Sequence, residues 1–263
     1  MYLISILYYI TKSNLIQLLF TFKFNYVIII QICFLESIAM ITIDKVNIDE
    51  ALRYMGYKKN IDIENIKPIL IECEKNLLNE VNYRYCYKVF DIEKSNDIVK
   101  LKNTDLILEG NSIKNHLAEC NKAILMACTL SDKVDKLINR LNIIDMTAAL
   151  ITDSMASALI EQFCNKVEEE IRTNLSLKYI TWRFSPGYGD LPINIQNNFI
   201  KTLNAHKLIG LTATNNNILI PRKSVTAIIG ISDLPIPQKK RGCAICSMNK
   251  TCQFRKRGTH CGF

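Results

Sequence analysis

The sequence predicts an α+β fold, in which an antiparallel sheet is flanked by helices and is followed by a small cysteine-rich C-terminal segment. Three observations predict this class. Segments of strand character follow one another between residues 83 and 108. A long segment at 144–174 repeats apolar residues at helical spacing, and a turn at 215–217 separates two further strand-like segments.

The first elements after residue 40 are expected to be two helices and then three strands. A short helix at 48–57 would be capped by Asp49 and would end at Gly56. Apolar residues at helical spacing predict a second helix at 63–81. The strands are expected at 83–90, 98–101 and 106–108.

Helices dominate the middle of the chain. We expect a helix at 112–119, a buried strand at 122–130 and an amphipathic helix at 131–141. The long helix at 144–174 carries an apolar stripe that should face the core. The stripe consists of Ala156, Ile160, Phe163, Val167 and Ile171.

A strand, a loop, a helix and a hairpin follow the long helix. Alternation predicts a strand at 177–184, with Thr181 and Arg183 on one face and Trp182 and Phe184 on the other. A turn-rich loop then leads to the next helix, and the hairpin closes the domain. These elements are expected at 185–192, 193–206, and 209–213 with 218–231.

The first 39 residues are apolar, and their only charged residues are Lys12, Lys23 and Glu36. Three interpretations remain open: a translation start at Met40, a membrane anchor, or a packed helix. Residues 14–35 are long enough to cross a bilayer, but Lys23 near the middle would cost about 2.5–3.5 kcal/mol there. We therefore expect no membrane partner and a cytoplasmic protein. The expected domains are 1–39, 40–235 and 236–263.

The net charge of +8 is unevenly distributed. Seven Lys or Arg residues and no acidic residue follow Asp233, so the rest of the chain is nearly neutral. A uniformly basic nucleic-acid-binding protein would distribute its charge differently. Nucleic acid is therefore not the expected partner of the main domain.

The loop WRFSPGYGDLP at 182–192 carries the most chemical information in the chain. Arg183 offers a planar set of donors suited to a carboxylate, and Tyr188 offers a ring face suited to a sulfonium cation or an adenine. Gly187 and Gly189 allow the backbone to approach a ligand closely. A structural turn uses the same residue types, so the loop by itself leaves both interpretations open.

This loop resembles the Arg-Pro-x-Pro-Gly-Tyr signature of the activation domain of cobalamin-dependent methionine synthase, and residues 50–57 and 129–135 resemble the form of that domain found as a separate polypeptide. The segment ILIPRKSVTAIIG at 218–230 resembles the closing strand of that family. Other similar segments are LIEQF at 159–163, EEEIR at 168–172, EALRYMGY at 50–57 and TLSDKVD at 129–135. The resemblance covers roughly residues 45–232, and it implies a domain that binds S-adenosylmethionine.

The resemblance also implies which residues bind the ligand. Arg183 would hold the ligand's carboxylate, the backbone at Ser185 and Gly187 would line the pocket, and Tyr188 would stack near the sulfonium or ribose. Glu161, on the long helix, would reach the ligand's amine, or else be an ordinary solvated glutamate. The chain departs from the family at Phe184, where proline is usual, and at residues 190–192.

The implied activity is reactivation of cobalamin-dependent methionine synthase or of a related corrinoid protein. In the family, the cobalamin of the partner is reduced by one electron and then takes the methyl group of S-adenosylmethionine. Because both reactants are already activated, alignment supplies the catalysis and no catalytic residue is expected. This agrees with a chain that has only three histidines, His116, His206 and His260, and no triad.

Four of the ten cysteines are close together near the C-terminus, at Cys243, Cys246, Cys252 and Cys261. This density of thiolates predicts a metal centre, either zinc or a [4Fe–4S] cluster, and His260 is an alternative to one of the thiolates. The other six cysteines are expected to be small buried hydrophobic residues. They are Cys33, Cys73, Cys86, Cys120, Cys128 and Cys164.

The basic residues around these four cysteines suit an acidic electron donor such as a flavodoxin, the acidic face of the synthase, or nucleic acid. Only Phe254 and Phe263 are interleaved with them, which disfavours binding of single strands by stacking. The alternative to corrinoid reactivation is therefore a zinc-stapled binding module that recognises nucleic acid or a protein partner.

Overall fold

The computed structural model describes residues 41–57, 63–95 and 98–236. The contacts of the chain divide it after Ala39, and everything described below belongs to the second unit, Met40–Phe263. The predictions for residues 1–39 and for the four-cysteine segment fall outside the described residues. Within the described ranges, no helix has the length and apolar character needed to cross a membrane.

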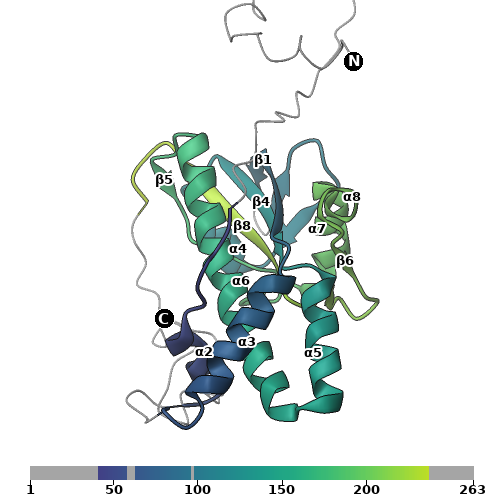
Figure 1. Cartoon of the computed structure of the whole chain (residues 1–263). Coiled ribbons are helices and arrows are strands. Elements are labelled where there is room, and N and C mark those ends of the chain that lie inside the picture. The colour runs from purple at the N-terminus through teal and green to yellow at the C-terminus, as the bar shows by residue number, and fades with distance from the viewer. Residues whose placement is uncertain (1–40, 58–62, 96–97, 237–263) are drawn as a thin grey trace, which may run out of the picture. The chain divides into compact units, whose positions relative to one another are not determined.

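A six-stranded antiparallel sheet forms the centre of the fold (Figure 1). Its strand order is β3-β2-β1-β4-β8-β5. The strands are β1 (Arg84–Lys94), β2 (Ile98–Leu101), β3 (Ile107–Glu109), β4 (Lys122–Thr129), β5 (Tyr179–Ile180) and β8 (Ser224–Ser232). The final strand, β8, therefore lies between β4 and β5, although it is the last in sequence.

Helices cover both faces of this sheet, as the predicted fold class requires (Figure 1). One face packs against α2 (Ile48–Tyr54), α3 (Lys67–Glu80), α5 (Asp132–Ile144) and α6 (Met146–Asn174). The other packs against α4 (Asn111–His116), α7 (Gln196–Leu203) and α8 (Ala205–Ile209). A short 3-10 turn, η1 (Ile193–Ile195), precedes α7.

The central strand β4 is buried on both faces, which confirms the buried strand predicted at 122–130. Alternate residues point into two separate apolar cores. Met126 belongs to the core that contains Phe163 of α6, whereas Leu125 belongs to the core that contains Phe199 of α7. A strand covered by helices on both sides has a continuous apolar sequence for this reason.

The long helix predicted at 144–174 is present as α6, and all five residues of its apolar stripe are buried. The helix begins at Met146 because Asp145 caps it. The Asp145 carboxylate accepts hydrogen bonds from the backbone N–H groups of Thr147 and Ala148, at 2.9 and 3.0 Å.

Three other helices differ from their predictions. Asn47, rather than Asp49, caps the first helix, because its side chain accepts a bond from the Glu50 N–H at 3.0 Å. The second helix begins at Lys67, with a proline in its first turn, rather than at residue 63. The helix predicted at 193–206 is divided into η1, α7 and α8, and the break between α7 and α8 falls at Asn204, which has a left-handed conformation.

The predicted strand at 218–231 is in fact two strands. The first, β7 (Leu219–Ile220), forms a small hairpin with β6 (Thr212–Ala213). The second, β8, joins the main sheet between β4 and β5. Pro221 lies between β7 and β8 and has no N–H to continue a ladder of hydrogen bonds.

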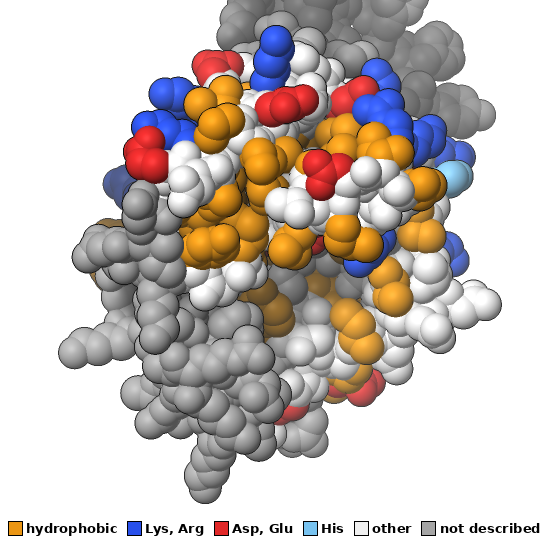
Figure 2. Space-filling view, turned by 60° about the horizontal axis from the view of Figure 1, so that its bottom comes forward, with side chains coloured by type: hydrophobic (Ala, Val, Ile, Leu, Met, Phe, Trp, Pro, Cys, Tyr) orange, Lys and Arg blue, Asp and Glu red, His pale blue; other side chains and the backbone are white. Residues whose placement is uncertain are grey.

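Apolar side chains are exposed at the corner where α5 turns into α6. Figure 2 views the molecule from its helical end and shows apolar side chains among polar ones on this face. The exposed residues at the corner are Ile143, Ile144, Met146 and Leu150. None of them belongs to either core, so the described fold does not depend on them.

Five of the six cysteines predicted to be buried hydrophobic residues are free and buried. They are Cys73, Cys86, Cys120, Cys128 and Cys164. Cys33 lies outside the described residues. The prediction is confirmed for the five that the structure describes, and burial raises the pKa of several of these thiols, including Cys86 to about 12.

Candidate functional site

The strand that leads into the loop at 182–192 is interrupted by a bulge. Ile180 pairs with Ile231 of β8, whereas Phe184 pairs with Ile228, so the strand gains one residue relative to its partner between these points. The predicted alternation holds for Trp182, Arg183 and Phe184. It is wrong for Thr181, which contacts His116 on the side of Phe184 instead of lying with Arg183. A bulge re-aims side chains, and here it separates Arg183 from its neighbours.

The bulge directs Arg183 towards α6, where three side chains bind its guanidinium. Nη1 donates to the Glu168 carboxylate at 2.8 Å, and Nη2 donates to Glu161 at 3.2 Å and to Asn165 at 2.8 Å. The Arg183 side chain is only 18% exposed. The structure thus brings together Arg183 and Glu161, two of the predicted ligand-binding residues.

The environment of Arg183 stabilises the charged form of its guanidinium. Burial alone would lower the pKa of its guanidinium, but the nearby Cys164 and the carboxylates of Glu168 and Glu161 outweigh it and raise the pKa above its ordinary value. A permanently charged, half-buried guanidinium is well suited to bind an anionic group.

The backbone of the loop is occupied by its own hydrogen bonds. The Gly187 N–H donates to the Leu191 carbonyl at 2.9 Å, and the Tyr188 N–H donates to the Ser185 carbonyl at 3.0 Å. The predicted pocket-lining backbone at Ser185 and Gly187 is therefore engaged within the loop. Gly187 has a positive φ of 89°, which favours glycine there without any ligand.

Asp190 ties the far end of the loop to α4. Its carboxylate accepts hydrogen bonds from the backbone N–H groups of Asn111 and Ser112, at 2.8 and 2.9 Å. The bond from Ser112 is the largest of several influences that lower the pKa of Asp190. A Cβ atom at Gly189 would collide with the Ser112 side chain, so the close approach predicted for Gly189 is to α4.

Aromatic rings pack on the other side of the loop from Arg183. The His116 ring lies 4.6 Å from that of Trp182 and 5.0 Å from that of Phe184, centroid to centroid. Tyr188 extends the cluster, at 6.1 Å from Phe184. Phe184 is buried, so the residue that replaces the family's usual proline fills the core beneath the loop.

His116 also contributes to the anchoring of the bulge. Its Nε2 lies 2.7 Å from the Thr181 hydroxyl, which in turn accepts a bond from the Gly230 N–H at 2.7 Å. No role in the site was predicted for His116 or Asp190. Both contact residues far away in the chain, and no local pattern signals such contacts.

The C-terminal end of α2 lies beside the same site. The Tyr54 side chain is 40% exposed and that of Tyr188 is 51% exposed. Burial first, and then the charges of Glu161 and Glu50, raise the pKa of Tyr54, with a smaller contribution from Tyr188. Glu161 of α6 and Tyr188 of the loop therefore both influence Tyr54, a residue that was not predicted.

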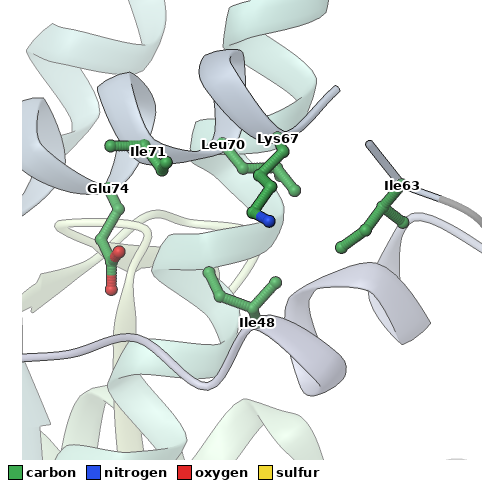
Figure 3. Close-up of a pocket in the computed structure, with 6 residues that line it drawn as sticks. All are labelled: Ile48, Ile63, Lys67, Leu70, Ile71 and Glu74. Atoms are coloured by element: carbon green, nitrogen blue, oxygen red, sulfur yellow. The ribbon is translucent and has the colours of Figure 1, made fainter. Parts of the chain in front are cut away.

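A separate hollow of about 220 Å³ lies between α2 and α3 (Figure 3). Its lining residues are Ile48, Ile63, Lys67, Leu70, Ile71 and Glu74. The two charged ones are engaged: Glu74 accepts a bond from the Val46 N–H at 2.7 Å, and Lys67 donates to Glu64 at 3.2 Å. The lining of this hollow is mostly apolar, so the hollow lacks the convergent polar groups that orient a bound ligand.

Metal binding by the main domain finds no support in the described ranges, since no group of three or more His, Cys, Asp or Glu side chains there could hold an ion. The predicted ligands, Cys243, Cys246, Cys252 and Cys261, lie beyond the described residues. Their role stays a prediction.

Comparisons with known proteins give a likeness in fold over most of the chain and a short likeness in sequence. No protein-family model matches the chain. The histidine–tRNA ligases of two strains of Ureaplasma parvum serovar 3 are 33% identical over 90 residues, which is 34% of this chain. The chain spans only 19% of the length of these relatives, so the match does not assign the activity of these ligases to this chain.

A solved structure of similar fold is described as the MetH reactivation domain bound to AdoHcy. The TM-score is 0.58, with 81% of this chain and 82% of the other covered, at 12% sequence identity. At this identity the comparison shows a shared fold, a six-stranded antiparallel sheet with flanking helices. It confirms the predicted fold class.

Proposed function

We propose that this chain binds S-adenosylmethionine through the loop at 182–192 and α6, and presents its methyl group to a corrinoid protein. The observation that carries the proposal is the pairing of Arg183 with Glu161 at 3.2 Å, at the start of the loop that bears the exposed ring of Tyr188. These groups match the carboxylate, ammonium and sulfonium of the ligand. The fold shared with a domain bound to AdoHcy supports the same ligand class.

The partner in this proposal is a cobalamin-dependent methionine synthase or a related corrinoid protein. The reduced corrinoid of the partner supplies the nucleophile that accepts the methyl group, and S-adenosylhomocysteine remains. The residues of this chain supply binding and orientation. Arg183 holds the carboxylate, Glu161 the ammonium, and Tyr188 contacts the sulfonium or ribose, so proximity accounts for the rate.

Isothermal titration calorimetry with S-adenosylmethionine tests the proposal. Wild-type protein should bind, and Arg183→Ala should weaken binding by about tenfold or more, as expected when a charge-assisted bidentate contact is lost. Arg172→Ala, an exposed arginine on the same helix, is the matched control and should bind like wild type. Failure of the wild type to bind would leave the zinc-stapled binding module as the remaining hypothesis.

We also propose that Cys243, Cys246, Cys252 and Cys261 hold zinc or a [4Fe–4S] cluster. The donor set supports this, because four thiolates suit either centre. A cluster would suit a protein that receives an electron from an acidic donor such as a flavodoxin, and free cysteines elsewhere in the chain accord with a reducing, cytoplasmic location.

Anaerobically purified protein should show either a broad visible absorption band with bound iron or a colourless centre with one equivalent of zinc. Replacement of Cys243 and Cys246 by serine should abolish the metal content, while Cys73→Ser should retain it. Protein that contains neither metal after anaerobic purification would refute the proposed centre.

A further inference from the structure

Arg183 does not offer all of its donors equally. A guanidinium has five N–H donors. Both hydrogens of Nη2 are taken, by Glu161 and Asn165, and one hydrogen of Nη1 is taken by Glu168. Among the described residues, Nε and the second hydrogen of Nη1 have no hydrogen-bond partner. Three of the five N–H donors of the guanidinium are therefore bound by residues of α6.

A carboxylate that forms two parallel bonds with arginine uses Nη2 together with either Nε or Nη1. In both arrangements it needs a hydrogen of Nη2. One of the two α6 residues at Nη2 must therefore give way when such a ligand binds. The Glu161 contact is the longer, at 3.2 Å against 2.8 Å for Asn165.

Solvent exposure, like hydrogen-bond length, indicates that Glu161 is held less tightly than Glu168. The Glu168 side chain is 26% exposed, whereas that of Glu161 is 44% exposed. The shorter and more buried ion pair is worth more than the longer and more exposed one, because solvent screens it less. Glu161 is thus the partner that can be exchanged, and Glu168 is the one that stays.

We propose that Glu168 is a positioning residue, which holds the Arg183 guanidinium in place while Glu161 exchanges partners with the ligand. This inference rests on the proposed function and specifies its ligand as the zwitterionic end of an α-amino acid. The ligand carboxylate replaces Glu161 at Nη2 of Arg183. The ligand ammonium pairs with the released Glu161 carboxylate, so the half-buried site gains no net charge.

Two probes separate recognition of the zwitterion from recognition of the nucleoside. S-adenosylhomocysteine carries the amino-acid end, and 5′-methylthioadenosine keeps the nucleoside and thioether without it. Glu168→Gln should weaken calorimetric binding of the first by about tenfold and leave that of the second within about twofold. The matched control is Glu169→Gln, an exposed glutamate one residue further along α6, which should change neither.

A second variant tests whether Glu168 acts by holding Arg183. Glutamine keeps an acceptor for Nη1, whereas alanine does not, so Glu168→Ala should lose more affinity for S-adenosylhomocysteine than Glu168→Gln. Equal losses for both probes would show a general structural role and overturn the inference. Wild-type protein that binds both probes equally would also overturn it, while nucleoside binding would stand. Wild-type protein that binds neither these probes nor S-adenosylmethionine would refute the proposed function itself.

Discussion

Gly189 shows how a residue assigned to a ligand can serve the fold instead. It has a positive φ of 57°, and a Cβ atom there would meet the Ser112 side chain. The sequence suggested that this glycine lets backbone approach a ligand. The close neighbour is α4, so the glycine allows the loop to pack against that helix.

Gly189→Ala should therefore lower the free energy of unfolding by more than the backbone strain of a left-handed alanine alone would. The left-handed backbone costs an alanine about 1–2 kcal/mol, and the collision with Ser112 adds about 1–3 kcal/mol. Gly56→Ala is the control, since Gly56 has a φ of 85° and a Cβ atom added there would meet nothing within 4 Å. Urea denaturation measures both, and equal losses would contradict the role of Ser112.

At the scale of elements, the contact between the loop and α4 depends on one carboxylate. The charged form of Asp190 accepts two backbone hydrogen bonds, which lower its pKa in the folded state. A carboxyl group whose folded pKa is depressed contributes stability above its unfolded pKa. That contribution is lost as the pH falls through the folded value.

Asp190→Asn should therefore reduce the free energy of unfolding near neutral pH and remove part of its dependence on acid. The difference between wild type and variant should shrink as the pH falls from 6 to 3. Chemical denaturation at several pH values measures this difference, and other titrating groups cancel in the comparison. A difference that is independent of pH would show that the charge of Asp190 has no part in the contact.

The bulge after β5 is the other element that the site requires. It lies between Ile180 and Phe184 and includes Arg183, which points towards α6, whereas Phe184 packs in the opposite core. A strand of strict alternation would also have placed these two on opposite faces. However, Thr181 contacts His116 on the aromatic side, and the alternation had placed it with Arg183.

For the molecule as a whole, two apolar cores on either side of one sheet position the site at its edge. The core under α6 supports Arg183 and the glutamates, and the core under α7 supports the aromatic side of the loop. The strand β8 contacts both β4 and the segment that leads into the loop. Two chains that are only 12% identical can share this fold, because a packed apolar core tolerates many combinations of apolar side chains.

The sequence by itself determined the features that depend on local periodicity. The apolar stripe of α6, the continuous apolar run of β4 and the turn-rich loop with Arg183 were all predictable, because each leaves a repeating pattern or a cluster of turn residues. The fold class followed from their order along the chain.

Only the tertiary structure decided which distant residues meet. Glu168 binds Arg183, Asp190 binds the start of α4, and His116 contacts Thr181. It also decided that β8 returns between β4 and β5. The physical reason is that strand pairing and the partner of a buried charge depend on contacts between separate segments, and these leave no periodic trace in either segment.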